Sequence, residues 1–202
     1  MQNRSDIRVL IACEESQREC LAFRELGFSA FSCDVQECSG GHPEFHILGD
    51  VRDVLCDGWD LMIAHPPCTY LTKAQGNLMF PNKVLDKERY ARGLEGAQFF
   101  LDLFNAPIPY IAVENPTPLK IFNLPRYNCV VQPFEFGEPW SKRTCLWLKN
   151  LPPLIPTCYA PTYKSYVYCT RGGKKRSKSF AGISEAMAVQ WGAFVESELC
   201  KL

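Results

Sequence analysis

Two short stretches place reactive side chains directly after apolar runs. The run Leu-Met-Ile-Ala at 61–64 is followed by His65, two prolines and Cys68, and a second run at 110–113 is followed by Glu114, Asn115 and a proline. Proline cannot donate to a sheet ladder, so each predicted strand ends there. In an open α/β sheet, ligands bind at the carboxyl ends of the strands. A thiol nucleophile and a carboxyl acid at one such edge are the pair needed to attack a pyrimidine ring.

Pro66-Pro67-Cys68 and Glu114-Asn115 resemble the catalytic motifs of the DNA (cytosine-5) methyltransferases. The resemblance implies that Cys68 adds to C6 of cytosine, that Glu114 contacts N3 of the same ring, and that Asn115 orients the loop. Because burial raises a carboxyl pKa, we expect Glu114 to be protonated at neutral pH.

The resemblance extends, more loosely, to Lys142-Arg143-Thr144, which is similar to the family's eighth motif. It implies that Arg143 supports the base; a solvated basic turn is the alternative for this stretch. Contacts to the substrate are expected from Pro67, Thr69 and Lys142.

The first part of the chain predicts a nucleotide-binding unit. Residues 8–13 form an apolar strand, Ser16 and Glu19 form a capping box that starts a helix, and Gly27 ends it. Residues 28–33 form a second strand that ends in Asp34. This order of strand, helix, strand and acidic residue is the first half of a Rossmann-like fold.

In the methyltransferases this unit binds S-adenosylmethionine. The resemblance implies that Asp34 holds the ribose hydroxyls and Asp50 contacts the adenine amino group, although a turn residue and a cap are the alternatives. The first loop, 13–17, departs from the family's Phe-x-Gly-x-Gly pattern, and without glycine its backbone approaches a ligand less closely. The expected cofactor-binding residues are Cys13, Glu14, Asp34, Asp50 and Pro66.

The remaining pattern predicts a strand at 46–48, a helix at 87–105, shorter strands at 127–136 and 144–148, and a helix capped by Ser184 that runs to Leu199. The family resemblance implies that residues 69–86, which follow Cys68, form a mobile lid. The expected fold is α/β: a Rossmann-like methyltransferase sheet with helices on both faces. Residues 1–202 are predicted to form one domain, in which the Pro- and aromatic-rich residues 117–182 are a small, irregular substrate-recognition subregion.

Composition limits the partners. Lysine plus arginine and aspartate plus glutamate both number 22, which argues against a strongly basic, non-specific duplex binder. A local basic run beside tyrosines is expected to contact phosphates; an exposed flexible loop is the alternative. Its members are Lys174, Lys175 and Arg176.

Eleven cysteines, a polar amino terminus and no long apolar run predict reduced thiols, a cytoplasmic location and no membrane span. A zinc site is conceivable, but the spacing of its candidates is irregular and no metal is predicted. These candidates are Cys129, Cys145, Cys158 and Cys169.

The leading hypothesis is S-adenosylmethionine-dependent C5 methylation of cytosine in DNA, through a covalent adduct between Cys68 and C6. Only residues 154–182 remain for reading a duplex, which is small for major-groove recognition and base flipping. Two alternatives therefore stay open: C5 modification of a free cytosine nucleotide, and a non-catalytic nucleotide- or nucleic-acid-binding protein that retains the fold.

Overall fold

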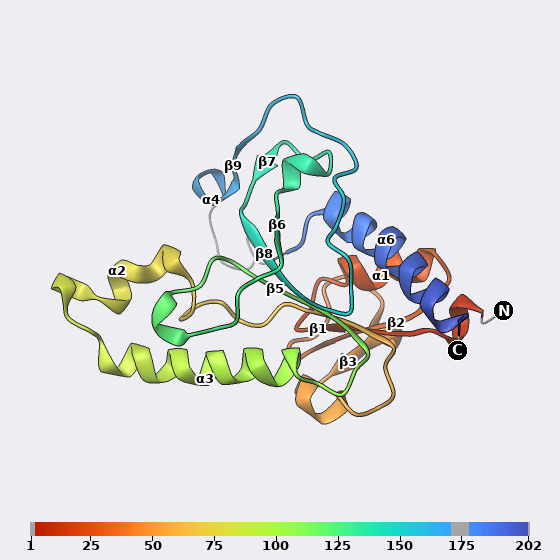
Figure 1. Ribbon diagram of the computed structural model, residues 1–202, viewed down its shortest axis with the longest axis horizontal. Coiled ribbons are helices and arrows are strands. Elements are labelled where there is room, and N and C mark those ends of the chain that lie inside the picture. The colour runs from red at the N-terminus through yellow and green to blue at the C-terminus, as the bar shows by residue number, and fades with distance from the viewer. Residues whose placement is uncertain (1–2, 171–177, 202) are drawn as a thin grey trace.

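The computed structural model describes residues 3–170 and 178–201. Its centre is a seven-stranded sheet in the order β3-β2-β1-β4-β5-β8-β6 (Figure 1). Strands β3, β2, β1, β4 and β5 run parallel, whereas β8 runs antiparallel to β5 and β6. The strands are β1 (Arg8–Ala12), β2 (Ser29–Asp34), β3 (His46–Leu48), β4 (Leu61–Ala64), β5 (Tyr110–Asn115), β6 (Cys129–Val131) and β8 (Thr144–Lys149). The predicted α/β fold with a mostly parallel, Rossmann-like sheet is confirmed.

The order of the strands reverses between β1 and β4. From β1 the chain proceeds outward to β2 and β3, and then returns to place β4 on the other side of β1. Ala64 is paired with Ala12 of β1 and with Val113 of β5, so the carboxyl ends of these three strands lie side by side. Such a reversal is where open α/β sheets bind ligands.

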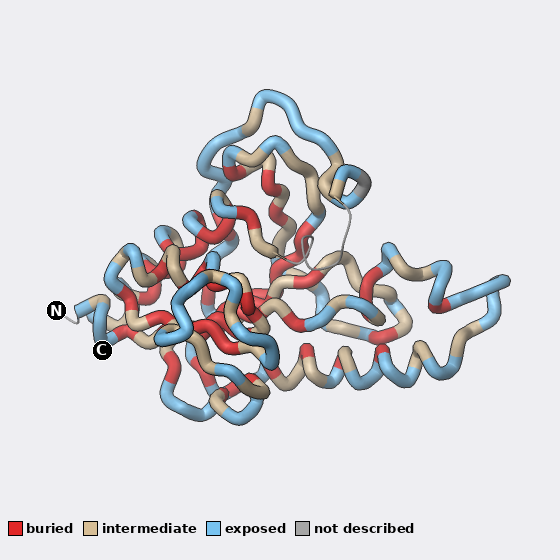
Figure 2. Tube along the Cα trace, turned by 180° about the vertical axis from the view of Figure 1, so that it is seen from behind, coloured by how far each residue is buried: buried red, intermediate tan, exposed pale blue. Residues whose placement is uncertain are grey.

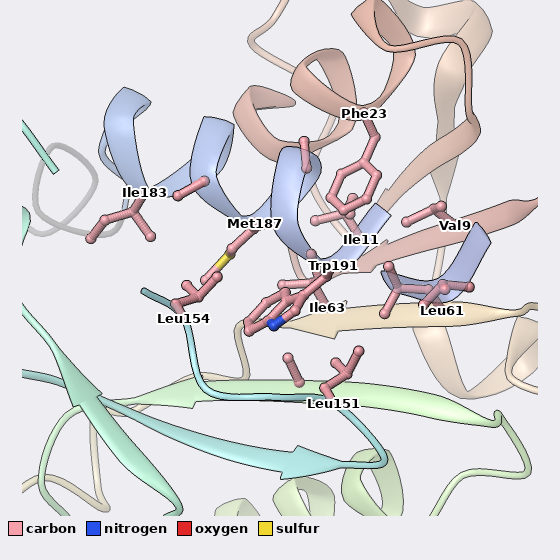
Figure 3. Packing of buried hydrophobic residues seen from close by; sticks show 14 of the residues in the cluster. Val9, Ile11, Phe23, Leu61, Ile63, Leu151, Leu154, Ile183, Met187 and Trp191 are labelled. Atoms are coloured by element: carbon pink, nitrogen blue, oxygen red, sulfur yellow. The ribbon is translucent and has the colours of Figure 1, made fainter. Parts of the chain in front are cut away.

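Helices cover both faces of the sheet, as predicted. α1 (Arg18–Glu25) and α6 (Ala181–Leu199) pack against each other on one face, where Trp191 of α6 lies among Phe23, Ile63 and other buried side chains (Figure 3). α3 (Lys87–Phe104) covers the other face. There the rings of Phe100 and Trp147 pack in a T-shaped arrangement, with 4.9 Å between their centroids. None of the described helices is long and apolar enough to cross a membrane.

Two predicted helix starts are wrong. The first helix begins at Arg18, its N-cap Gln17 has left-handed backbone geometry, and no Ser16–Glu19 capping box forms. The carboxylate of Glu14 accepts hydrogen bonds from the backbone of Glu19 and Cys20 instead. The last helix begins at Ala181, three residues before its predicted cap Ser184; the Ser184 hydroxyl donates to the Phe180 carbonyl from inside the first turn.

The segment 69–86, predicted as a lid, contains three short helices. They are a 3-10 turn (Lys73–Gln75), α2 (Gly76–Met79) and a second 3-10 turn (Pro81–Lys83). Leu71 and Met79 are fully buried in a small core with Ala97 of α3 and Phe122. The segment 69–86 is therefore anchored to α3, although the part of it farthest from the sheet is largely exposed (Figure 2).

After β5 the chain is irregular. The predicted strand 127–136 is only β6, because Pro133 begins a 3-10 turn (Pro133–Glu135). A small separate sheet pairs β7 (Trp140–Ser141) with β9 (Lys164–Ser165), and α4 (Tyr166–Cys169) follows. The remaining 3-10 turns of the described chain are Arg4–Asp6, Pro43–Phe45, Val51–Val54 and Lys120–Phe122.

Candidate active site

A hydrogen bond joins the two motifs that the sequence singled out. The side-chain amide of Asn115, which is fully buried at the end of β5, donates to the backbone oxygen of Pro66 at 3.1 Å. The backbone oxygen of Cys68, two residues further on, accepts from Leu71 and Thr72 and so starts a tight turn. The Cys68 side chain is half-buried and lies four residues after the end of β4, at the same sheet edge as Glu114.

Glu114 faces a histidine that the sequence analysis did not single out. The Nδ1 atom of His65 lies 3.4 Å from Oε2 of Glu114, and its Nε2 atom lies 3.6 Å from Oε1 of Glu19. The side chain of Glu114 is 18% exposed, that of His65 is 13% exposed, and that of Glu19 is fully buried. His65 was detectable as a titratable residue directly after a buried strand; Glu19 was misinterpreted as part of a helix cap.

This neighbourhood reverses the expected ionisation of Glu114. Burial acts to raise its pKa, but the hydrogen bond with His65 and the positive charges of Lys142 and His65 outweigh burial and hold the pKa of Glu114 below its usual range. The prediction of a raised carboxyl pKa is wrong, because it considered burial alone. Glu114 is ionised at neutral pH.

His65 is shifted in the opposite direction. Burial acts to lower its pKa, but the carboxylates of Glu19 and Glu114 outweigh burial and raise the pKa of His65 above its ordinary value. Burial likewise acts against ionisation of Glu19, yet the charge of His65 lowers its pKa, with nearby Glu14 and Ser179 contributing. The His65 imidazole therefore lies between two carboxylates that favour its protonated form.

A cavity of about 20 Å³ opens between these groups, which is room for roughly one water molecule. Neither carboxylate oxygen of Glu19 has a partner in hydrogen-bond geometry among the described residues, nor does Nε2 of His65. The start of α6 and the segment before it form one side of the cavity. Its lining comprises Glu19, His65, Glu114, Lys142, Thr144, Ser179, Phe180, Ile183 and Met187.

The glycine-free first loop follows a glycine-like backbone path. Cys13 and Gln17 have φ values of 60° and 59°, in the left-handed region that favours glycine. The Gln17 side chain exchanges two hydrogen bonds with the backbone of His42, at 2.8 and 3.1 Å. A Cβ atom on Gly40 would lie 2.6 Å from Cβ of Gln17, so this loop is tightly packed against the segment that follows β2.

Asp34 and Asp50 converge on this edge. Burial raises the pKa of the Cys13 thiol, and the carboxylates of Asp34 and Asp50 add to the effect, so both charges lie near the end of β1. Asp34 is half-exposed and accepts from the backbone of Gln36, while Asp50 caps the following turn and pairs with Arg52 at 2.5 Å. Two carboxylates beside a half-buried loop fit a ligand that carries hydroxyl groups, an amino group and a positive charge, as S-adenosylmethionine does.

The other predicted site residues lie at different depths. Pro66 is buried, whereas Pro67 and Thr69 are exposed beside Cys68. Arg143 donates to the hydroxyls of Thr117 and Tyr127 at 3.3 and 3.0 Å. Lys142 is half-buried and lines the cavity. The basic residues Lys174, Lys175 and Arg176 lie outside the described residues.

Most cysteines of the protein are distinct from Cys68 in setting. All eleven lie within the described residues, and none of them forms a disulfide bond. Burial raises the pKa of Cys20 to about 12 and that of Cys33 to about 11, which makes both poor nucleophiles at neutral pH. Within residues 3–170 and 178–201, no cluster of three or more His, Cys, Asp or Glu side chains is arranged to hold a metal ion.

Comparison with known proteins finds similarity in fold. No family model matches the chain, and no curated protein matches its sequence. One similar structure, from E. coli, is described as a DNA modification methyltransferase encoded within a prophage; it shows 15% identity and a TM-score of 0.48 over 78% of this chain and 53% of its own. The Entamoeba histolytica methyltransferase EhMeth shows 13% identity and a TM-score of 0.48 over 79% of this chain and 57% of its own. The chain therefore spans little more than half the length of either protein.

Proposed function

We propose that the protein methylates C5 of cytosine in DNA, with S-adenosylmethionine as the methyl donor. The observation that carries the proposal is the Asn115–Pro66 hydrogen bond between adjacent strand ends, which fixes the Cys68 loop against the strand that bears Glu114. It supports a thiol and a carboxylate that act on one ring. The motif resemblance supplies the identity of that ring.

The chemistry follows from the electronic structure of cytosine. C5 is too weak a nucleophile to accept a methyl group unaided, so the Cys68 thiolate forms a bond to C6 and the C5–C6 π electrons move onto C5 and the N3 side of the ring. A proton delivered at N3 stabilises that charge. After alkylation a base removes the C5 proton, the electrons re-form the double bond, and Cys68 leaves. Arg143 and Lys142 support the base during these steps, and Asn115 holds the loop.

The cofactor would lie at the carboxyl ends of β1 and β2, where it supplies an electrophilic methyl group. Asp34 would accept hydrogen bonds from the ribose hydroxyls and Asp50 from the adenine amino group. Cys13, Glu14 and Pro66 would border it. The Glu14 carboxylate is occupied by the backbone of α1, so we assign it the role of shaping the loop.

The test is methyl transfer from labelled S-adenosylmethionine to cytosine-containing DNA and, in parallel, to a deoxycytidine nucleotide. We expect transfer to DNA by the wild type and none by Cys68→Ala, with unchanged cofactor binding by calorimetry. Cys56→Ala removes an exposed thiol outside the site and should retain wild-type transfer. A wild type that binds the cofactor and transfers to neither substrate would overturn the proposal.

The free nucleotide is the second candidate substrate, favoured by the zero net charge and the short segment 154–182. Transfer to the nucleotide alone would assign it. Absence of cofactor binding would instead assign a binding protein that kept the fold and lost the reaction.

A further inference from the structure

We propose that Glu19, His65 and Glu114 form a buried proton path in which His65 supplies, through Glu114, the proton that cytosine N3 receives. The inference rests on the proposed function. His65 and Glu19 act through Glu114 and are positioning residues, whereas Glu114 touches the ring.

Three different elements build the path. Glu19 comes from the first turn of α1, His65 follows β4 at the reversal of strand order, and Glu114 belongs to β5. The imidazole lies between the two carboxylates, at 3.6 Å from Glu19 and 3.4 Å from Glu114. The backbone of His65 is fixed as well, because its N–H donates to the Ala12 carbonyl at 2.9 Å.

Burial requires that these charges be compensated. An isolated carboxylate with the full burial of Glu19 would be strongly destabilised, and His65 is the cation that faces it. Four charged or titratable groups surround the imidazole: Glu19 and, behind it, Glu14 from the α1 end; Glu114 from β5; and Lys142 from the turn between β7 and β8. Burial and the Glu19 charge raise the pKa of Glu14 well above its usual range, which disfavours a third negative charge beside Glu19. The remaining two carboxylates then balance His65 and Lys142.

The resting ionisation leaves Glu114 without a proton of its own to donate. As the Cys68–C6 bond forms, the Nδ1 proton of His65 moves to Glu114, and Glu114 passes a proton to N3. Glu114 is again a carboxylate, His65 is neutral, and the ring holds one additional proton. When the double bond re-forms, the proton leaves N3 and returns by the same route to His65, so the path itself ends as it began. The C5 proton goes to the separate base and is the one proton that each methyl transfer releases. Glu19 keeps His65 charged and correctly oriented between turnovers.

The first test observes the histidine directly and needs no activity. The chain has three histidines, so ¹⁵N NMR titration resolves them, and His65→Gln assigns the signal. We expect a pKa for His65 above the ordinary 6.5 in the wild type, and a downward shift in Glu19→Gln and in Glu114→Gln. Glu44→Gln is the matched control, because Glu44 pairs with exposed His42 at 3.0 Å and should leave His65 unchanged.

A His65 signal that neither carboxylate variant shifts would overturn the path. Glu19 is fully buried, so its replacement could impair folding. Glu114→Gln changes a less buried side chain and provides an independent test of the same shift. Failure of the proposed function gives a different result: wild-type protein would transfer no methyl group while the titration still located the proton on His65.

The second test is the pH dependence of methyl transfer. The path delivers a proton only while His65 is charged, so the rate should fall as pH rises through the raised pKa of His65. In Glu19→Gln the fall should begin at lower pH, with the rate at low pH less affected. A merely structural role for His65 would lower the rate at every pH alike, and an unchanged alkaline limb in Glu19→Gln would contradict the proposal.

Discussion

Glu114 shows that the ionisation of a buried carboxyl depends on which side chains face it. Its strand end and its burial beside a tight turn are readable from the sequence. The pairing with His65 is not, because nothing in a linear pattern indicates which of the groups at a sheet edge touch. Burial alone would keep the carboxyl protonated, whereas the observed cations keep it charged.

Replacement of Glu114 tests its role at the ring. Glu114→Gln keeps the shape of the side chain but cannot relay a proton, so turnover should fall about 10²- to 10⁴-fold, the range of general acid–base contributions. Cofactor affinity, measured by calorimetry, should be unchanged. Glu185→Gln changes an exposed carboxylate on α6 and serves as the control. Near wild-type turnover in Glu114→Gln would remove the carboxyl from the mechanism.

The strands of the sheet were predictable because they are continuous apolar runs with clear ends. β4 is buried at all four positions, as expected of a parallel strand covered on both faces, and it ends at Ala64, two residues before the first of two prolines. The helix starts were not predictable to the same degree. The sequence pattern indicates Ser16 as the N-cap, but the N-cap in the structure is Gln17, which has left-handed backbone geometry. The side chain of Glu14, not that of Ser16, accepts a hydrogen bond from the first turn of α1.

The inward face of α3 cannot be read uniquely from the sequence. A sequence of mixed apolar and small residues permits more than one stripe at helical spacing. In the structure Leu94 is exposed and Ala97 is buried, and Phe100 and Leu103 are fully buried. Packing against Trp147 of β8 selects the stripe that contains Phe100.

The start of α6 gives a prediction for stability. A Cβ atom on Gly182 would lie 2.0 Å from the backbone oxygen of Phe136, so an added methyl group forces the backbone to move. We expect Gly182→Ala to lower the free energy of unfolding by about 1–3 kcal/mol, the usual cost of overpacking. Denaturation in urea measures it.

Gly49→Ala is the control for that experiment, because nothing lies within 4 Å of its added Cβ. If Gly182→Ala unfolds at the same urea concentration as Gly49→Ala, the close contact between α6 and the segment at Phe136 is not rigid.

At the scale of the molecule, the two ends of the chain complete the site. α1 supplies Glu19, and α6 packs beside α1 (Figure 3). Ile183 and Met187 of α6 line the cavity at His65. The α/β class and the parallel core were predictable from the strand–helix alternation. The packing of α1 against α6 was not predictable from the sequence pattern, because it depends on tertiary contacts between segments far apart in the sequence.

In the proposed reaction, Cys68 adds reversibly to C6 of cytosine. Addition makes C5 basic enough to take a deuteron from D₂O, and elimination then releases the original proton, so the exchange requires no methyl donor. Mass spectrometry of nucleosides from cytosine-containing DNA, incubated with the protein in D₂O, measures deuterium at C5. We expect incorporation with the wild type and with Cys56→Ala, and none with Cys68→Ala. Equal incorporation with and without Cys68, or none with a wild type that binds the DNA, would contradict the account.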